Sequence, residues 1–417
     1  MNDYIAAHNK NNLITCSTPE IWIICIALLT LPKLCKRYLS LNRIITENTL
    51  YNRLRPLDSL RGFAAIGVAF FWHYKHFDFV FFDANPSALP LFSAFKWFYL
   101  CGWNLVDFFF VLSGFIFMHV YSKKITDNKI TEKDFFILRI SRLYPLHIIT
   151  LFTVAFIQYY RYFTGKGFFQ CDINDLYHLI LNLFFIQAGF FEDGLSFNGP
   201  SWSLSCEIIA YILFFYVLRK VKNPLPYFIF FVFIGMSILQ KQLNMPLFNA
   251  PVGKMLIGFF IGCLTYVLNL QILKLEKKNK NIIFLIILIL SVLVGVMVQK
   301  AGYMKIFGHW DRVMPLLVYP LMILSALNVL FLNKFFSLKP FTYLGDLSYS
   351  IYLIHFPVQL MMVTFLPMTG LVPNYRSWTG LAVFMAITVV LAALSYHLAE
   401  KPLQNLIRRK FLAERAG

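Results

Sequence analysis

Long apolar runs separated by short polar segments dominate the sequence. A helix needs about 20 mostly apolar residues to cross a bilayer, because each residue adds about 1.5 Å. Runs of about this length recur along the chain, joined by short loops that are rich in lysine and arginine. The pattern predicts an all-α, polytopic integral membrane helix bundle of about ten transmembrane helices. The predicted spans cover residues 61–80, 97–121, 143–163, 201–218, 225–240, 252–270, 281–299, 313–332, 348–366 and 379–398.

Two further apolar runs do not fit this set. Residues 21–35 form a short run that a proline and a lysine interrupt, so we expect either an interfacial helix or an extra span. Residues 176–190 are apolar enough to cross. A full crossing would place the basic segments 219–222 and 274–280 outside, against the preference of lysine and arginine for the cytoplasmic side. We therefore expect residues 176–190 to be re-entrant or peripheral.

Basic residues also set the predicted orientation and the domain boundaries. Lysine and arginine crowd the segment 36–61, so the first span should run outward from the cytoplasm. The sequence Glu400-Lys401-Pro402 is predicted to stop the last helix on the cytoplasmic side. The predicted organisation is an N-terminal extension at 1–50, one membrane domain at 51–403 and a basic cytoplasmic tail at 404–417.

The composition supports a membrane protein and argues against a soluble domain and a nucleic-acid-binding protein. The chain has 417 residues, of which 59% are hydrophobic and only 14% charged, far too apolar for a soluble domain of this length. The net charge of +18 is concentrated in the short loops, so we do not expect nucleic acid as a partner. The seven cysteines are scattered and include no C-x-x-C pair, which supports neither a disulfide framework nor a zinc site. We expect no metal.

Four of the ionisable side chains within or at the ends of the predicted spans are candidate site residues. An ionisable group in a membrane is costly and commonly marks a functional site. Arg61 and His73 stand at the two ends of an apolar run in the first span. Asp107, near mid-membrane, would either orient the His73 ring or tie its helix to a neighbour. Glu207 lies six residues into its span, where it would hold an acceptor hydroxyl, act as a second acid or base, or pair with an arginine.

Five sequence blocks carry a resemblance to a known family. They are LDSLRG at 57–62 continuing to His73, DFFFVLSGF at 107–115, RISRLYP at 139–145, NGPSWSLSCE at 198–207 and LGDLSYSIYLIH at 344–355. In this order the blocks resemble the family 3 membrane acyltransferases, which acylate sugars of bacterial surface polysaccharides and some secondary metabolites. The resemblance extends from Leu57 to about Leu403.

The resemblance implies that Arg61 and His73 are essential. Transfer of an acyl group from a thioester to a hydroxyl needs a base, and imidazole titrates in the useful range, so His73 is the predicted base. The usual family spacing would place the histidine at Trp72, one residue earlier. On a regular helix the extra residue turns His73 about 120° away from Arg61. We therefore predict a π-bulge between Gly62 and His73, with His76 as the second candidate base.

The remaining blocks supply candidate binding residues. The resemblance implies an acyl-CoA donor, and arginines suit its phosphates, so Arg139 and Arg142, with Tyr144, are predicted to bind it. Trp202 would either stack on a sugar or anchor the helix at the interface. Four residues of the last block recur at helical spacing and are predicted to line the cavity, His355 as a candidate second imidazole. They are Ser348, Tyr349, Tyr352 and His355.

These observations predict an O-acyltransferase of the bacterial inner (cytoplasmic) membrane. It would move an acyl group from cytoplasmic acyl-CoA to a hydroxyl of an envelope polysaccharide or lipid-linked glycan. Acetyl, from acetyl-CoA, is the favoured acyl group. Its expected partners are this carbohydrate or glycolipid acceptor and membrane lipid, and the sequence leaves the oligomeric state open. The alternative is a transporter or flippase, because mid-membrane charges also mark substrate pathways. Against it, the chain has no inverted repeat and a single candidate re-entrant segment.

Overall fold

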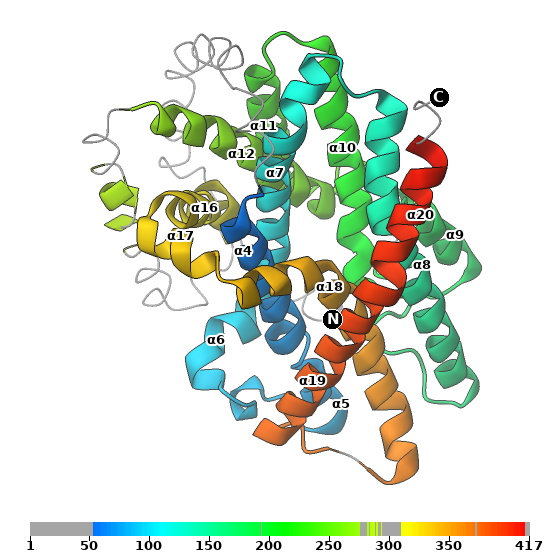
Figure 1. The fold of residues 1–417 in the computed structure, drawn as a ribbon. Helices are drawn as coiled ribbons and strands as arrows, with labels where there is room; N and C mark the ends of the chain where they lie inside the picture. The colour runs from blue at the N-terminus through cyan, green and yellow to red at the C-terminus, as the bar shows by residue number, and fades with distance from the viewer. Residues whose placement is uncertain are drawn as a thin grey trace. The chain divides into compact units, whose positions relative to one another are not determined.

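The computed structural model (Figure 1) consists of helices joined by loops. No β-strand occurs among the described residues, so the predicted all-α class is confirmed. The described residues belong to one compact unit, Asn48–Gly417. The predicted extension at 1–50, with its apolar run, lies outside them. The structure describes residues 53–192, 194–275, 310–371 and 373–412, and scattered helical residues between 282 and 293.

Six helical stretches of the described chain are long and apolar enough to cross a membrane. They are Phe92–Thr126, Glu132–Phe163, Gly199–Lys220, Ala250–Leu273, Lys339–Thr369 and Trp378–Leu412. The helices that line the site or pack against those that do are α4 (Arg55–Gly67), α5 (His76–Phe81), α6 (Phe92–Cys101), α7 (Leu105–Thr126), α8 (Glu132–Phe163), α10 (Trp202–Lys220), α12 (Ala250–Leu273), α18 (Lys339–Phe365), α19 (Trp378–Ser395) and α20 (Lys401–Leu412).

The predicted count of ten spans is not confirmed. Helix α11 (Leu225–Lys241) has 17 residues, fewer than a typical span. The predicted span 313–332 is not straight, because α16 (Tyr319–Asn328) and α17 (Leu330–Phe336) meet at 90°. Val329 between them has an extended backbone, which ends the first helix. This bent pair would be a seventh span, and the predicted span 281–299 lies mostly outside the described residues.

The predicted helix stop at Glu400-Lys401-Pro402 is wrong. Helix α19 passes through a π turn, Tyr396–Glu400, directly into α20, which continues to Leu412 (red in Figure 1). A proline removes one helical hydrogen bond, but the wider π turn immediately before it has already changed the bonding pattern. The first part of the predicted tail 404–417 is therefore helical.

The first predicted span contains the expected bulge. Helix α4 changes to a π-helix over Val68–Trp72, and the His73 amide donates to the Val68 carbonyl five residues earlier, at 3.0 Å. This one wide turn absorbs the extra residue between Arg61 and His73. Trp72 packs against Gly102, whereas the His73 ring lies beside His355 of α18. The predicted bulge is confirmed, and it turns His73 rather than Trp72 toward α18.

Glycines allow α4 and α18 to touch along their backbones. A Cβ atom on Gly345 would lie 2.1 Å from the Asp58 carbonyl oxygen, and one on Gly62 would lie 2.8 Å from the Gly345 nitrogen. Gly114 of α7 makes a similar contact with α12, where a Cβ would lie 1.8 Å from the Phe259 oxygen. These backbone contacts hold α4 against α18 and α7 against α12.

Helix α18 is tied to the segment before α10 at a proline. Pro357 has no N–H to offer the Leu353 carbonyl four residues earlier. The Asn198 side-chain amide donates to that carbonyl instead, at 3.1 Å. This bond holds the start of α10 against the middle of α18.

The apolar run at 176–190 does not cross as one helix. Helix α9 (Leu176–Leu183) has eight residues, about 12 Å of rise, and the following turn is interrupted at Gly189 with φ 92°. The prediction of a re-entrant or peripheral segment agrees with this geometry.

An ion-pair cluster lies at the far end of the first predicted span. Arg376, in the loop before α19, donates to the buried Asp78 of α5 at 2.6 Å and also to Asp83. The hydrogen bond from Arg376 holds the pKa of Asp83 below its usual value, and bonds to both carboxylates raise the pKa of Arg376. Because α5 begins at His76, this cluster also limits movement of the segment from His73 to His76.

Candidate functional site

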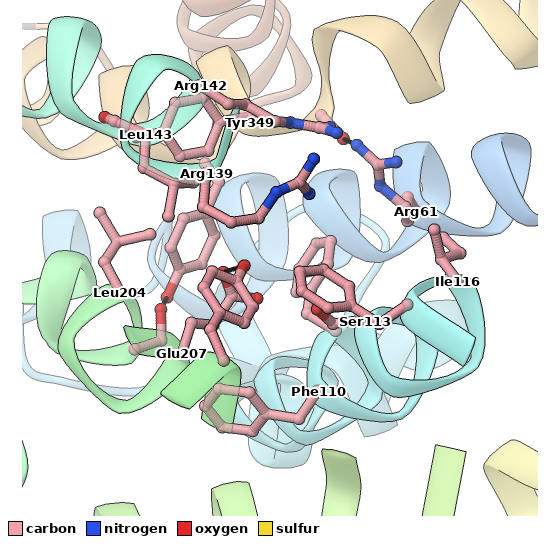
Figure 2. A pocket seen from close by; sticks show the side chains of 16 residues that line it. Arg61, Phe110, Ser113, Ile116, Arg139, Arg142, Leu143, Leu204, Glu207 and Tyr349 are labelled. Carbon is pink, nitrogen blue, oxygen red and sulfur yellow. Dashed lines mark hydrogen bonds between the residues drawn. The ribbon is translucent and has the colours of Figure 1, made fainter. Parts of the chain in front are cut away.

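A cavity of about 120 Å³ lies between α4, α7, α8, α10 and α18 (Figure 2). Seven of the predicted site residues line it, which brings together side chains that the sequence separates by nearly 300 positions. They are Arg61, Arg139, Arg142, Glu207, Ser348, Tyr349 and Tyr352. The rest of the lining is Phe109, Phe110, Ser113, Ile116, Phe117, Leu143, Ser203, Leu204 and Tyr211.

Three arginines converge on this cavity (Figure 2). Arg139 and Arg142 are three residues apart on α8 and therefore share a helix face. Arg61 comes from α4, where it donates to the Ser348 hydroxyl at 3.3 Å and lies 3.5 Å from Asp58. The residues that line the cavity include these three guanidinium groups and a single carboxylate. An anionic ligand would balance that charge.

Glu207 is the carboxylate of the cavity, and α10 carries it. The Tyr211 hydroxyl, one turn further on, donates to it at 2.5 Å. Arg142, Arg61 and Arg139 all interact with Glu207 electrostatically. The roles predicted for Glu207, to hold an acceptor hydroxyl, to act as a second acid or base, or to pair with an arginine, stay predictions.

Aromatic side chains form the apolar wall. The Tyr211 ring stacks on Phe117 with centroids 4.5 Å apart, and the Arg139 guanidinium lies 5.0 Å from the Phe117 ring. Trp202 packs its ring edgewise against Phe110, at 6.0 Å. The lining includes Phe110 and not Trp202, so Trp202 supports the wall from behind.

Tyrosines of α18 connect the cavity to its neighbouring helices. The Tyr349 hydroxyl donates to the Leu143 carbonyl of α8. The Tyr352 hydroxyl donates to the Pro200 carbonyl at 2.8 Å and lies 3.1 Å from the Ser203 hydroxyl. Tyr352 lines the cavity, and its ring also lies 6.0 Å from that of His355 between centroids.

The histidines lie beyond Tyr352, next to the cavity rather than in its lining. The His73 and His355 rings meet edge to face, with centroids 4.6 Å apart. His76 is 5.4 Å from His73 by the same measure, and its Nδ1 donates to the His73 carbonyl at 2.9 Å. The Gln359 amide donates to the same carbonyl at 2.8 Å. The predicted base therefore lies in an imidazole cluster next to the arginine-lined cavity.

Two other predicted site residues lie away from the cavity lining. Asp107 accepts from the Asn104 amide at 3.2 Å, and Asn104 in turn accepts from the Tyr319 hydroxyl of α16. This geometry supports the interpretation of Asp107 as a tie between helices. The Tyr144 ring lies edgewise on Phe185, at 5.6 Å, and its predicted contact with a donor stays a prediction.

Tyr211, Ser203 and Gln359 were not predicted from the sequence. Tyr211 follows Glu207 by four residues, and Gln359 follows His355 by four, so helical spacing from the predicted residues was a usable signal. Ser203 approaches Tyr352 across two helices, and nothing in the linear pattern indicates that contact.

Comparison with known proteins places this architecture in a family. The sequence model of the acyltransferase domain matches residues 55–397, most of the chain and all five motif blocks. The chain belongs to this acyltransferase family. Membership confirms the predicted class, and together with the apolar helices it indicates a multi-pass membrane protein. The family match begins at α4 and ends in the π turn before α20.

Curated relatives match over different parts of their length. A Rhizobium radiobacter protein, "Protein 2 in picA locus", is 31% identical over 37% of this chain and 76% of its own length. The peptidoglycan O-acetyltransferase OatA of Listeria monocytogenes is 25% identical over 72% of this chain and 51% of its own. The putative peptidoglycan O-acetyltransferase YrhL of Bacillus subtilis is 24% identical over 88% and 57%. The chain thus spans little more than half of the two O-acetyltransferases. No solved structure matched the chain.

Proposed function

We propose that this protein transfers an acyl group from cytoplasmic acyl-CoA to a hydroxyl of an envelope polysaccharide or lipid-linked glycan. Acetyl, from acetyl-CoA, is the favoured acyl group. The proposed location is the bacterial inner membrane, with the acceptor glycan and membrane lipid as partners. The observation that carries the proposal is the pairing of an arginine-lined cavity with an adjacent imidazole cluster. The O-acetyltransferase names of two relatives support acetyl as the group and a polysaccharide as the acceptor.

The arginines suit the donor. Acyl-CoA carries several phosphates, and guanidinium groups bind phosphate oxygens in pairs of hydrogen bonds. In the predicted orientation Arg61, Arg139 and Arg142 stand at the cytoplasmic end of their helices, where the donor would arrive. The cavity wall of Phe110, Phe117 and Leu204 would then face the thioester end.

The imidazole cluster suits the chemistry. His73 would take the proton of the acceptor hydroxyl as its oxygen attacks the thioester carbon. The carbon–sulfur bond then breaks, the CoA thiolate leaves, and the proton on His73 neutralises it. Arg61 bonds to Ser348, and His73 lies beside His355. Ser348 and His355 are seven residues apart on α18, about 10 Å along the helix, which sets the scale of the separation between Arg61 and His73. A donor bound at Arg61 could thus present its acyl end near His73.

The test uses membranes that contain the full chain. Radiolabelled acetyl-CoA is added, and label in the envelope glycan and release of free CoA are both measured. We expect both from the native protein, and loss of both from His73→Ala. The control is His397→Ala, because the exposed His397 lies on the π turn after α19, outside the cavity lining, and hydrogen-bonds to the exposed Tyr343. Substrate uptake without acetylation in the native protein would instead support a transporter.

A further inference from the structure

Two neighbouring histidine rings each bury a nitrogen that lacks a hydrogen-bond partner among the described residues. The atoms are Nδ1 of His73 and Nε2 of His355. The rings meet edge to face at 4.6 Å between centroids. A buried polar atom without a partner is costly, so such a pair in one place calls for a functional explanation.

The hydrogen bonds of His355 identify its tautomer. Its Nδ1 lies 3.2 Å from the Ile351 carbonyl, and a carbonyl oxygen can only accept. Nδ1 therefore carries the proton of the neutral ring, which leaves a lone pair on Nε2. His355 is fully buried in the middle of α18. It thus presents a fixed acceptor, and not a donor, at its unpaired nitrogen.

Three hydrogen bonds hold the backbone of His73, so the position from which its ring projects is fixed. Its amide donates to Val68 in the π-bulge, and its carbonyl accepts from Gln359 and from His76. The His73 residue is partly exposed, and its Nδ1 is not part of the exposed surface.

We propose that His355 is a positioning residue for His73. Its Nε2 accepts a hydrogen bond from Nδ1–H of His73, directly after a small ring rotation or through one water molecule. This bond fixes the tautomer of His73 in which Nε2 is unprotonated and turned toward the acceptor hydroxyl. When that hydroxyl gives its proton to Nε2, the bond to His355 stabilises the resulting imidazolium, the role that a carboxylate has beside a catalytic histidine elsewhere.

A neutral partner fits this position better than a carboxylate. A carboxylate needs further hydrogen bonds to offset its burial. Asp107, the acidic residue predicted as an alternative partner, is bonded to Asn104. The His355 imidazole needs only its backbone bond to Ile351 and the bond to His73. The inference rests on the proposed function of His73 as the base.

Amide side chains separate the two nitrogens of His355 in an experiment. His355→Gln places an amide oxygen near the former Nε2, whereas His355→Asn replaces only the Nδ1 end. His355→Phe keeps the ring and removes both. Each purified variant is first compared with the native protein by size exclusion and thermal unfolding, and rates are expressed per folded protein.

We expect His355→Gln to retain kcat within about tenfold and His355→Asn and His355→Phe to lose about 100-fold, the range seen when a supporting hydrogen-bond partner is removed. The KM for acetyl-CoA should change little in all three, because the arginines that would bind the donor are untouched. Equal kcat in the three variants, whether all native-like or all reduced, would refute the positioning role. If the native protein is active and His73→Ala is not, such a result overturns this inference alone. An inactive native protein overturns the proposed function.

Discussion

Glu207 shows how much a single residue depends on its partners. Its carboxylate faces three arginines and accepts one short hydrogen bond from Tyr211. That bond holds one carboxylate oxygen, so the other is left to face the arginines. The position of the negative charge in the cavity is therefore set by a tyrosine that lies one helical turn away.

Tyr211→Phe should reduce acyl transfer by about 10- to 100-fold, because a hydrogen bond to a charged group contributes about 1.5–3 kcal/mol. Phenylalanine keeps the stack on Phe117, so the fold should persist. The matched control is Tyr216→Phe on the same helix, where the hydroxyl bonds the exposed Glu132 outside the cavity. The measurement is the rate of CoA release. Similar losses in both variants would mean that the Glu207 contact has no special role.

Individual site residues were predictable where a charge stands in an apolar run. Arg61 and Glu207 stood out in the sequence because burial of their charge is costly. Arg142 was selected through its motif and the match of arginine to phosphate, and the structure gathers all three in one cavity. Tyr144 was selected through its motif alone, and its ring lies on Phe185. Hydroxyl and amide groups such as Ser203 carry no such cost signal, so their roles depend on contacts that only the fold creates.

At the scale of elements, the π-bulge at Val68–Trp72 decides which side chain meets α18. It holds one residue more than a regular helix would over the same rise. The prediction of this bulge succeeded because the family spacing and the helix repeat together left one residue to accommodate. By contrast, the 90° bend between α16 and α17 was missed, since the apolar run continues through Val329 without a sequence break.

Removing one residue from the bulge tests this interpretation. Deletion of Ala69 should restore a regular helix with His73 still directed toward α18, so acyl transfer should persist at a reduced rate. Insertion of one alanine after Ala69 turns His73 by about a further 100° and should abolish transfer. Both variants are assayed for label in the glycan beside a thermal melt. Equal loss in the two variants would contradict the role of the bulge in aligning His73.

At the scale of the whole molecule, the proposed transfer would run from the arginines toward the histidines. The arginines come from α4 and α8, and the histidines follow α4 along the chain, toward the Arg376 cluster. The class and the helical nature of the chain followed from hydropathy. The number of spans did not, because hydropathy measures length and composition, whereas bends and short helices depend on packing.

Thiol labelling can test the predicted orientation. Lys222→Cys and Ser87→Cys are at exposed positions in loops that should lie on opposite sides of the membrane. Because the described cysteines are buried, the background needs Cys16, Cys25 and Cys35 replaced by serine. An impermeant maleimide should label the Ser87→Cys variant in intact cells and the Lys222→Cys variant only after lysis. Labelling of both from one side would contradict the orientation.

The hydrogen bond from Asn198 to the Leu353 carbonyl can be followed by infrared spectroscopy, and it reports on the contact between the start of α10 and α18. Since Pro357 supplies no N–H, the strength of hydrogen bonding at the Leu353 carbonyl is set by a side chain from another segment. The infrared stretching frequency of that carbonyl, isolated by an isotope label, should rise whenever the start of α10 moves away. A single backbone vibration would then report, during turnover, whether the Glu207 helix and the His355 helix stay together.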